Sequence, residues 1–134
     1  MSDTYNDVVQ SYGRCLRDKA FIDRFYQILM SSHPDIRAAF SGTDFGRQRR
    51  ALRRGISTAL MFAAGNDFVK GGVDTMAEVH SRNGRAPVEP RMYALWLDSL
   101  VQAVEESDGE FTGELARRWR DAMGVVIRYF SDHY

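Results

Sequence analysis

The sequence predicts an all-helical domain, because apolar residues recur every three or four positions through most of its 134 residues. No stretch alternates apolar and polar residues for long enough to predict a strand. There is also no internal repeat and no low-complexity tract. A hydrophobic content of 44% is enough for one core, so we expect a single domain over residues 1–134.

The first three predicted helices lie before residue 41. Residues 5–16 have the helical period, and Thr4 is the expected N-cap. Residues 19–32 carry apolar side chains over so wide an arc that this helix is expected to run through the interior. A short helix then begins at Pro34, a residue suited to the first helical position, and ends near Phe40.

The later helices follow a loop at residues 41–46. Their apolar periods stop at Gly-Asn and Asn-Gly pairs, which end helices, and Pro90 is the expected first residue of one of them. These helices are predicted over residues 47–64, 69–82, 90–106 and 115–130.

The charge balance argues against a nucleic-acid or membrane partner. Lys plus Arg and Asp plus Glu number 18 each, so no overall field draws the chain to an anionic surface. Cys15 is the only cysteine, which excludes an internal disulfide and a cysteine zinc site, and we expect it to be inert. The longest apolar run, residues 59–64, is too short to span a membrane. We therefore expect a soluble cytoplasmic protein without an export signal.

Helices of such unequal length suit a globin arrangement better than an up-down bundle. The order and spacing of particular residues point the same way: Phe25 and Tyr26, Pro34, Phe40, Gln48 to Leu52, His80, Pro90 with Tyr93, and Trp119. From about residue 5 to 130, the chain resembles bacterial globins, namely the haem domain of flavohaemoglobins and the single-domain bacterial haemoglobins. The resemblance implies a globin fold of six to eight helices around a pocket for haem b.

The resemblance also implies roles for individual residues. His80 matches the proximal histidine that ligates the haem iron, and Phe40 matches the aromatic side chain that stacks on the haem. Tyr26 and Gln48 match distal residues that stabilise a ligand above the iron, while Tyr93 matches a tyrosine on the proximal side. The expected haem-binding set is Phe40, Leu52, Met76, His80, Tyr93 and Leu97.

Two departures from the flavohaemoglobin pattern concern the proximal side. The connection from His80 to Tyr93 is about three residues longer, so the loop at residues 82–89 is expected to cover the haem edge differently. The acidic partner that supports the proximal histidine in that family has no counterpart before Tyr134, where the sequence ends. We therefore expect a less strongly activated proximal ligand. His33 is expected to cap a helix, with a second iron ligand as the alternative.

These residue types suit haem chemistry on physical grounds too. A neutral imidazole that binds iron through one nitrogen must place its other N–H on an acceptor. The carbonyl of Met76, one turn before His80, is the expected acceptor. Dioxygen as a haem ligand carries partial negative charge, which hydroxyl and amide donors such as Tyr26 and Gln48 stabilise. Leu52 lies on the same helix face as Gln48 and is expected to keep the pocket dry.

Simpler interpretations of the same residues stay open. A lone histidine such as His80 is more often a satisfied core residue than a ligand. Phe40 and Leu52 would pack in the core in either case. Tyr26 could bond a backbone carbonyl instead of a ligand, and Gln48 could point into water.

An arginine cluster in the fourth predicted helix has three competing interpretations. It comprises Arg47, Arg49, Arg50, Arg53 and Arg54, near a helix N-terminus where cations are disfavoured. The simplest is a solvated face, since 16 of the 18 basic residues are arginine. The second is that some of these arginines dock an acidic reductase or pair with haem propionates. The third is nucleic-acid binding, although the cluster lacks the interleaved aromatic residues that such sites usually have.

The leading functional hypothesis is a haem protein that reversibly binds dioxygen, carbon monoxide or nitric oxide. An enzyme is the second: nitric oxide dioxygenase, which would need a separate reductase because the sequence has no Gly-rich dinucleotide fingerprint. The third is a gas-sensing or haem-free regulatory module. A monomer or a homodimer is expected.

Overall fold

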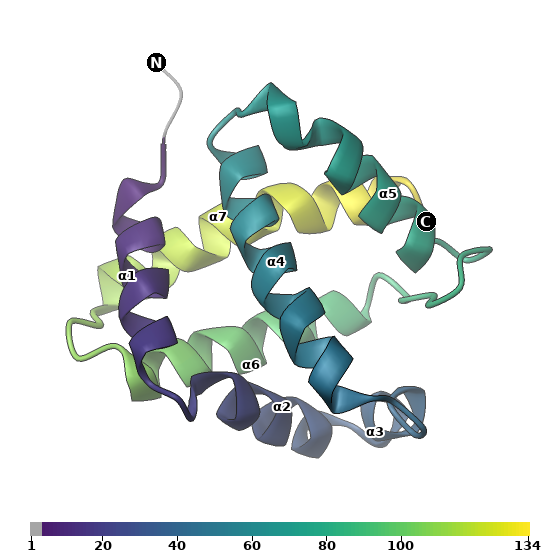
Figure 1. Ribbon diagram of the computed structural model, residues 1–134, viewed down its shortest axis with the longest axis horizontal. Helices are drawn as coiled ribbons and strands as arrows, with labels where there is room; N and C mark the ends of the chain where they lie inside the picture. The colour runs from purple at the N-terminus through teal and green to yellow at the C-terminus, as the bar shows by residue number, and fades with distance from the viewer. Residues whose placement is uncertain (1–3) are drawn as a thin grey trace.

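The computed structural model describes residues 4–134; the first three residues of the predicted domain lie outside the described part. In the described part there are seven α-helices, one short 3-10 helix and no strand (Figure 1). The elements are α1 (Asn6–Arg17), α2 (Phe21–Ser32), α3 (Pro34–Ala39), α4 (Phe45–Ala63), η1 (Asp67–Val69), α5 (Lys70–His80), α6 (Met92–Ser107) and α7 (Gly113–Asp132).

The predicted helix starts differ from the observed ones where a local cap decides. α1 begins after Tyr5, which has a left-handed backbone, and no side chain caps it, so the prediction of Thr4 as the N-cap is wrong. α4 begins two residues before the predicted start because the Asp44 carboxylate accepts the N–H groups of Gly46 and Arg47. At α3, by contrast, the imidazole of His33 caps the helix as expected, by accepting the Asp35 N–H at 3.0 Å.

Two boundaries on either side of the 81–91 connection also shift. α5 ends at His80 rather than at the Asn-Gly pair, because Ser81 turns to an extended backbone and its hydroxyl donates to the Glu78 carbonyl. α6 begins at Met92 rather than at Pro90, since Pro90 lies in a turn in which the Met92 N–H donates to the Glu89 carbonyl. The connection therefore has more residues outside helices than the sequence predicts.

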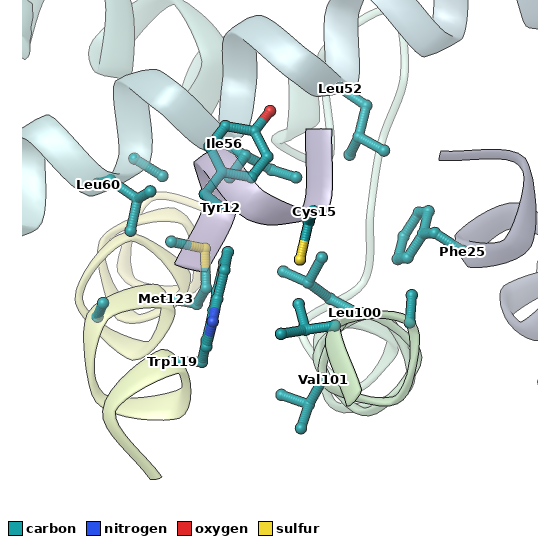
Figure 2. Packing of buried hydrophobic residues seen from close by; sticks show 14 of the residues in the cluster. Tyr12, Cys15, Phe25, Leu52, Ile56, Leu60, Leu100, Val101, Trp119 and Met123 are labelled. Atoms are coloured by element: carbon teal, nitrogen blue, oxygen red, sulfur yellow. The ribbon is translucent and has the colours of Figure 1, made fainter. Parts of the chain in front are cut away.

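The core is formed where α4 crosses α7 and where α2 packs along α6. Trp119 and Met123 of α7 lie below Ile56 and Leu60 of α4, and all four are buried (Figure 2). The Tyr12 ring of α1 meets Trp119 edge to face at 6.1 Å. No helix in residues 4–134 is both long and apolar enough to cross a bilayer.

A buried polar network fastens α1 to the turn between α6 and α7. The Asp108 carboxylate, whose side chain is fully buried, accepts bonds from the Arg14 guanidinium at 2.6 and 3.0 Å. The Ser11 hydroxyl donates to the same carboxylate at 2.6 Å and accepts the Trp119 indole N–H at 2.9 Å. The Arg14 bonds, with help from Ser11, lower the pKa of Asp108 to about 2 despite its burial.

Titration of Asp108 should therefore account for a measurable part of the pH dependence of the unfolding free energy in acid. Its pKa is lower in the folded chain than in the unfolded chain, so its contribution is present above about pH 4 and disappears as the pH falls towards 2. Asp108→Asn is expected to lower the unfolding free energy at pH 7 by about 2 kcal/mol and to flatten the pH dependence below pH 4. Urea unfolding at several pH values measures both effects.

The matched control is Asp98→Asn, which removes the carboxylate of an exposed ion pair with Arg120. Exposed ion pairs contribute little, so this variant should unfold like the parent. Equal losses of unfolding free energy in the two variants would show that the buried Asp108 carboxylate stabilises the fold no more than an exposed one does.

Candidate functional site

The imidazole of His80 is held by a loop rather than by its own helix. Its Nδ1 lies 3.1 Å from the carbonyl oxygen of Ala86. Because a carbonyl can only accept, Nδ1 carries the proton and Nε2 keeps its lone pair. Nε2 has no hydrogen-bond partner among residues 4–134. The prediction that the Met76 carbonyl would accept this proton is wrong, since the chain folds back and brings Ala86 closer.

Backbone contacts hold this loop under the end of α5. The Ala86 N–H donates to the Val79 carbonyl at 3.0 Å, and the Val88 N–H donates to the His80 carbonyl at 3.0 Å. The loop approaches the helix so closely at Gly84 that a Cβ there would overlap the carbonyl oxygens of Glu78 and Val79. Glycine at position 84 therefore permits the fold-back that places the Ala86 carbonyl at the imidazole.

The first half of α5 is fastened to α7 by charged side chains. The Asp74 carboxylate accepts hydrogen bonds from the Tyr129 hydroxyl and, at 3.1 Å, from the Lys70 ammonium. The Tyr129 and Lys70 bonds lower the pKa of Asp74. Together with the loop at its other end, these contacts fix the position from which α5 presents His80.

The environment of His80 on the α7 side is aromatic. The ring centroid of Phe130 lies 5.8 Å from that of His80 and 6.1 Å from that of Tyr93. Tyr93 is 8% exposed, burial raises its pKa to about 12, and its hydroxyl has no hydrogen-bond partner in the described part of the chain. Sequence reasoning took Phe130 only as a member of the helical period and did not find its contact with His80.

On the other side of the predicted pocket, Tyr26 of α2 is almost completely buried, at 5% exposure. Its hydroxyl donates to the backbone carbonyl of Gln48 at 3.3 Å, which was one of the interpretations left open. This is long for a hydroxyl hydrogen bond. Burial raises the pKa of Tyr26 to about 12, so the hydroxyl stays protonated and able to donate at neutral pH. Leu52 is buried nearby on α4, and the Gln48 side chain is half-buried.

An aromatic cluster surrounds Tyr26. The Phe40 and Phe45 rings meet the Tyr26 ring edge to face at 6.1 and 5.5 Å, and they stack on each other at 6.1 Å. Phe45 was not among the predicted site residues, because it lies in the stretch that the sequence predicts as a loop. The Asp44 cap, which starts the helix at Phe45, is the signal that could have found it.

An open hollow of about 540 Å³ lies between α2 and α4 beside Tyr26. Phe45 and Arg49 line it from α4, and an ion pair of 3.4 Å joins Arg49 to Asp23 of α2. All of its lining residues belong to these two helices. Of the residues predicted for the haem site, only Tyr26 lines this hollow.

The remaining predicted haem-binding residues lie on α5 and α6. Met76 and Leu97 are half-buried. The Met76 sulfur lies 3.9 Å from the place that a Cβ on Gly55 would occupy, which puts Met76 where α5 meets α4. The predicted residues therefore come from α2, α4, α5 and α6 and from the end of α3.

The donor set fits haem better than a bare metal ion. A bare ion generally needs three or four protein ligands, and residues 4–134 contain no group of three His, Cys, Asp or Glu that could hold one. The porphyrin supplies four nitrogens to its iron and requires only an axial ligand such as a histidine. His80 offers one free nitrogen, with the aromatic ring of Phe130 packed beside it.

Comparisons with known proteins point to one family. The flavohemoprotein of Bacillus cereus (strain ATCC 14579) is 26% identical over 128 residues, which are 92% of this chain and 31% of that protein. The flavohemoprotein of Bacillus anthracis is 25% identical over 134 residues, which are 97% of this chain and 32% of that protein. The chain thus spans about a third of the length of these curated relatives.

A solved structure from Pseudomonas aeruginosa PAO1 matches over the whole fold. It is described as structurally highly homologous to a human hemoglobin. It is 37% identical in sequence, superposes with a TM-score of 0.93, and the match covers 98% of each chain. No family model matches the sequence.

The two histidines outside the C-terminal end should be opposite tautomers. The Ala86 carbonyl requires a proton on Nδ1 of His80, whereas His33 accepts the Asp35 N–H at Nδ1 and must carry its proton on Nε2. Long-range ¹H–¹⁵N NMR correlations of the haem-free protein, at a pH where imidazole is neutral, distinguish the two forms. His33 serves as the internal control, and finding both rings protonated on Nε2 would contradict the loop contact at His80.

Proposed function

Because this chain belongs to the bacterial globin family, we propose that it reversibly binds a diatomic gas, namely dioxygen, carbon monoxide or nitric oxide, at haem b. The observation that carries the proposal is the free Nε2 of His80, left available by the bond from Nδ1 to Ala86. When bound, the haem supplies an iron centre that takes the gas as a ligand. The proposed setting is the cytoplasm, with the protein as a monomer or homodimer.

The proximal residues orient and isolate the imidazole. The Ala86 carbonyl fixes the tautomer and the plane of the His80 ring, and Phe130 limits its rotation by packing against it. A neutral carbonyl is a weaker hydrogen-bond acceptor than a carboxylate, so it pulls less strongly on the Nδ1 proton and makes the imidazole a weaker electron donor. We therefore assign His80 the role of a moderately electron-donating ligand.

The distal residues supply hydrogen bonds and exclude water. The Tyr26 hydroxyl can exchange its long bond to the Gln48 carbonyl for one to a gas ligand at small cost. The half-buried Gln48 amide is a second donor, and Leu52 provides an apolar wall one turn further along α4. Phe40 and Phe45 hold the Tyr26 ring in place through edge-to-face contacts.

Replacing His80 by alanine should abolish tight haem retention, since it removes the only proposed iron ligand. We expect the parent to take up one haem per chain, with a sharp Soret band that shifts reversibly with dithionite, dioxygen and carbon monoxide. The rate of haem transfer to apomyoglobin measures retention, and it should rise at least tenfold in His80→Ala.

The control for that experiment is His33→Ala, which removes a helix cap that is not among the proposed haem-binding residues. It should retain haem like the parent. Equal haem retention in His80→Ala and the parent would refute the ligand assignment. A parent that takes up no haem would leave the haem-free regulatory module as the better description.

Replacing Tyr26 by phenylalanine should speed dioxygen release. The variant keeps the aromatic packing with Phe40 and Phe45 and loses only the hydroxyl donor. Loss of one hydrogen bond to a partly charged ligand corresponds to a rise of about tenfold in the dissociation rate. Stopped-flow displacement of dioxygen by carbon monoxide measures it, and an unchanged rate would assign the stabilising role to Gln48.

Nitric oxide dioxygenation is the second candidate function, favoured by the similarity to flavohemoproteins. In this reaction dioxygen and nitric oxide combine to nitrate, and one electron per turnover must come from a separate reductase. Tyr26 and Gln48 would orient the dioxygen by hydrogen bonds. Nitrate formation over many turnovers in the presence of an added reductase distinguishes this enzyme from a reversible carrier, which would react once and stop.

A further inference from the structure

The outer face of α4 carries three arginines without an internal partner. Arg47, Arg50 and Arg54 are exposed, and none has an ion-pair partner among residues 4–134. We call these three residues the arginine stripe. Most other helical arginines that the structure describes do have carboxylate partners: Arg14, Arg24, Arg49, Arg117, Arg118 and Arg120.

The spacing of the arginine stripe puts it opposite the buried side of α4. Positions i, i+3 and i+7 of a helix lie on one face. At 100° per residue this face is turned away from Leu52 and Ile56, which are buried. α4 itself runs across the front of α6 and α7 in the view of Figure 1. A partner seated on the arginine stripe would thus be separated from the proposed haem pocket by the thickness of one helix, about 10 Å.

The arginine stripe lowers the stability of the helix that carries it. Like charges three or four residues apart repel by about 0.2–0.5 kcal/mol per pair. Cations in the first turns also oppose the helix dipole, and α4 has no acidic residue in its first turn. A feature that breaks a local rule without an internal compensation is expected to serve a contact with another molecule.

We propose that the arginine stripe docks an acidic electron-donor protein that returns the haem iron from the ferric to the ferrous state. The inference rests on the proposed haem function. One electron leaves the donor, which is oxidised by one unit, and one ferric iron is reduced; no bond is made or broken in this chain. A flavoprotein with an acidic face around its flavin has the required chemistry and charge.

The dimensions of the arginine stripe favour an acidic protein over a nucleic acid. Its three charges span about 10 Å of helix, and the chain as a whole has a formal net charge of zero. Carboxylates flank it, with Asp44 at the N-cap of α4 and Asp23 paired to Arg49. An extended phosphate backbone would run past the arginine stripe and be repelled by these carboxylates. A compact acidic patch can contact the three arginines without reaching the carboxylates.

The test compares the haem-loaded parent with the triple variant Arg47→Gln, Arg50→Gln, Arg54→Gln. Reduced flavodoxin, a small acidic flavoprotein, is the probe donor, and the ferric protein is reduced in a stopped-flow spectrometer. The parent rate should fall steeply with added salt, and the triple variant should be reduced about tenfold more slowly at low salt. Dithionite should reduce both proteins equally fast.

The control triple variant, Arg17→Gln, Arg120→Gln, Arg128→Gln, makes the same change in net charge on α1 and α7. It should be reduced at the parent rate. Equal slowing of both triple variants, or a parent rate independent of salt, would overturn the proposal. Parent chains retained more strongly on duplex DNA than on immobilised flavodoxin, with loss of that retention in the stripe variant, would overturn it in favour of a nucleic acid.

Two further readouts separate docking from other effects. Calorimetric titration with oxidised flavodoxin requires no electron transfer and works with haem-free protein, so it tests the arginine stripe even where haem uptake fails. Binding to the parent and its loss in the stripe variant support the proposal, and equal binding to both overturns it. The stripe variant should melt at the same or a higher temperature than the parent, because it loses only repulsive charges.

Discussion

The hydrogen bond from Nδ1 of His80 to the Ala86 carbonyl is the contact on which the proposed chemistry depends. It decides which imidazole nitrogen is free, and it exists only because the connection folds back beneath α5. That fold-back in turn requires glycine at position 84, where any side chain would overlap the helix backbone. A single missing Cβ therefore determines the tautomer of a residue four positions away, and with it the site available to an iron atom.

The helical architecture follows from the sequence because burial on one face imposes a period that is visible over ten or more residues. All seven α-helices and their order were predicted in this way, and the comparison with a solved structure confirms the globin fold. Boundaries were less predictable because one side chain or one turn decides them. Asp44 moves the start of α4, and the extended backbone of Ser81 ends α5 at His80 rather than at Asn83.

The site could be predicted only where chemistry resides in side chains with a recognisable spacing. His80, Tyr26 and Leu52 were selected in this way, and their roles towards haem stay predictions. A backbone carbonyl such as that of Ala86 leaves no mark in a sequence, since every residue has one. Phe130 could not be assigned either, because its contact with His80 joins residues 50 positions apart in the chain and depends on how α5 lies against α7.

The chain treats its charges in two contrasting ways. Asp108 is buried, yet three kinds of donor compensate it, so its charge holds α1 to the end of α6. The arginines of α4 are exposed, and four of them, Arg47, Arg50, Arg53 and Arg54, have no carboxylate partner in the described chain. A buried charge must be satisfied within the fold, whereas water tolerates an exposed one and leaves it available. The outer face of α4 is therefore open to the proposed electron donor while its inner face is fixed by packing, so the two proposed roles of this helix do not compete for the same side chains.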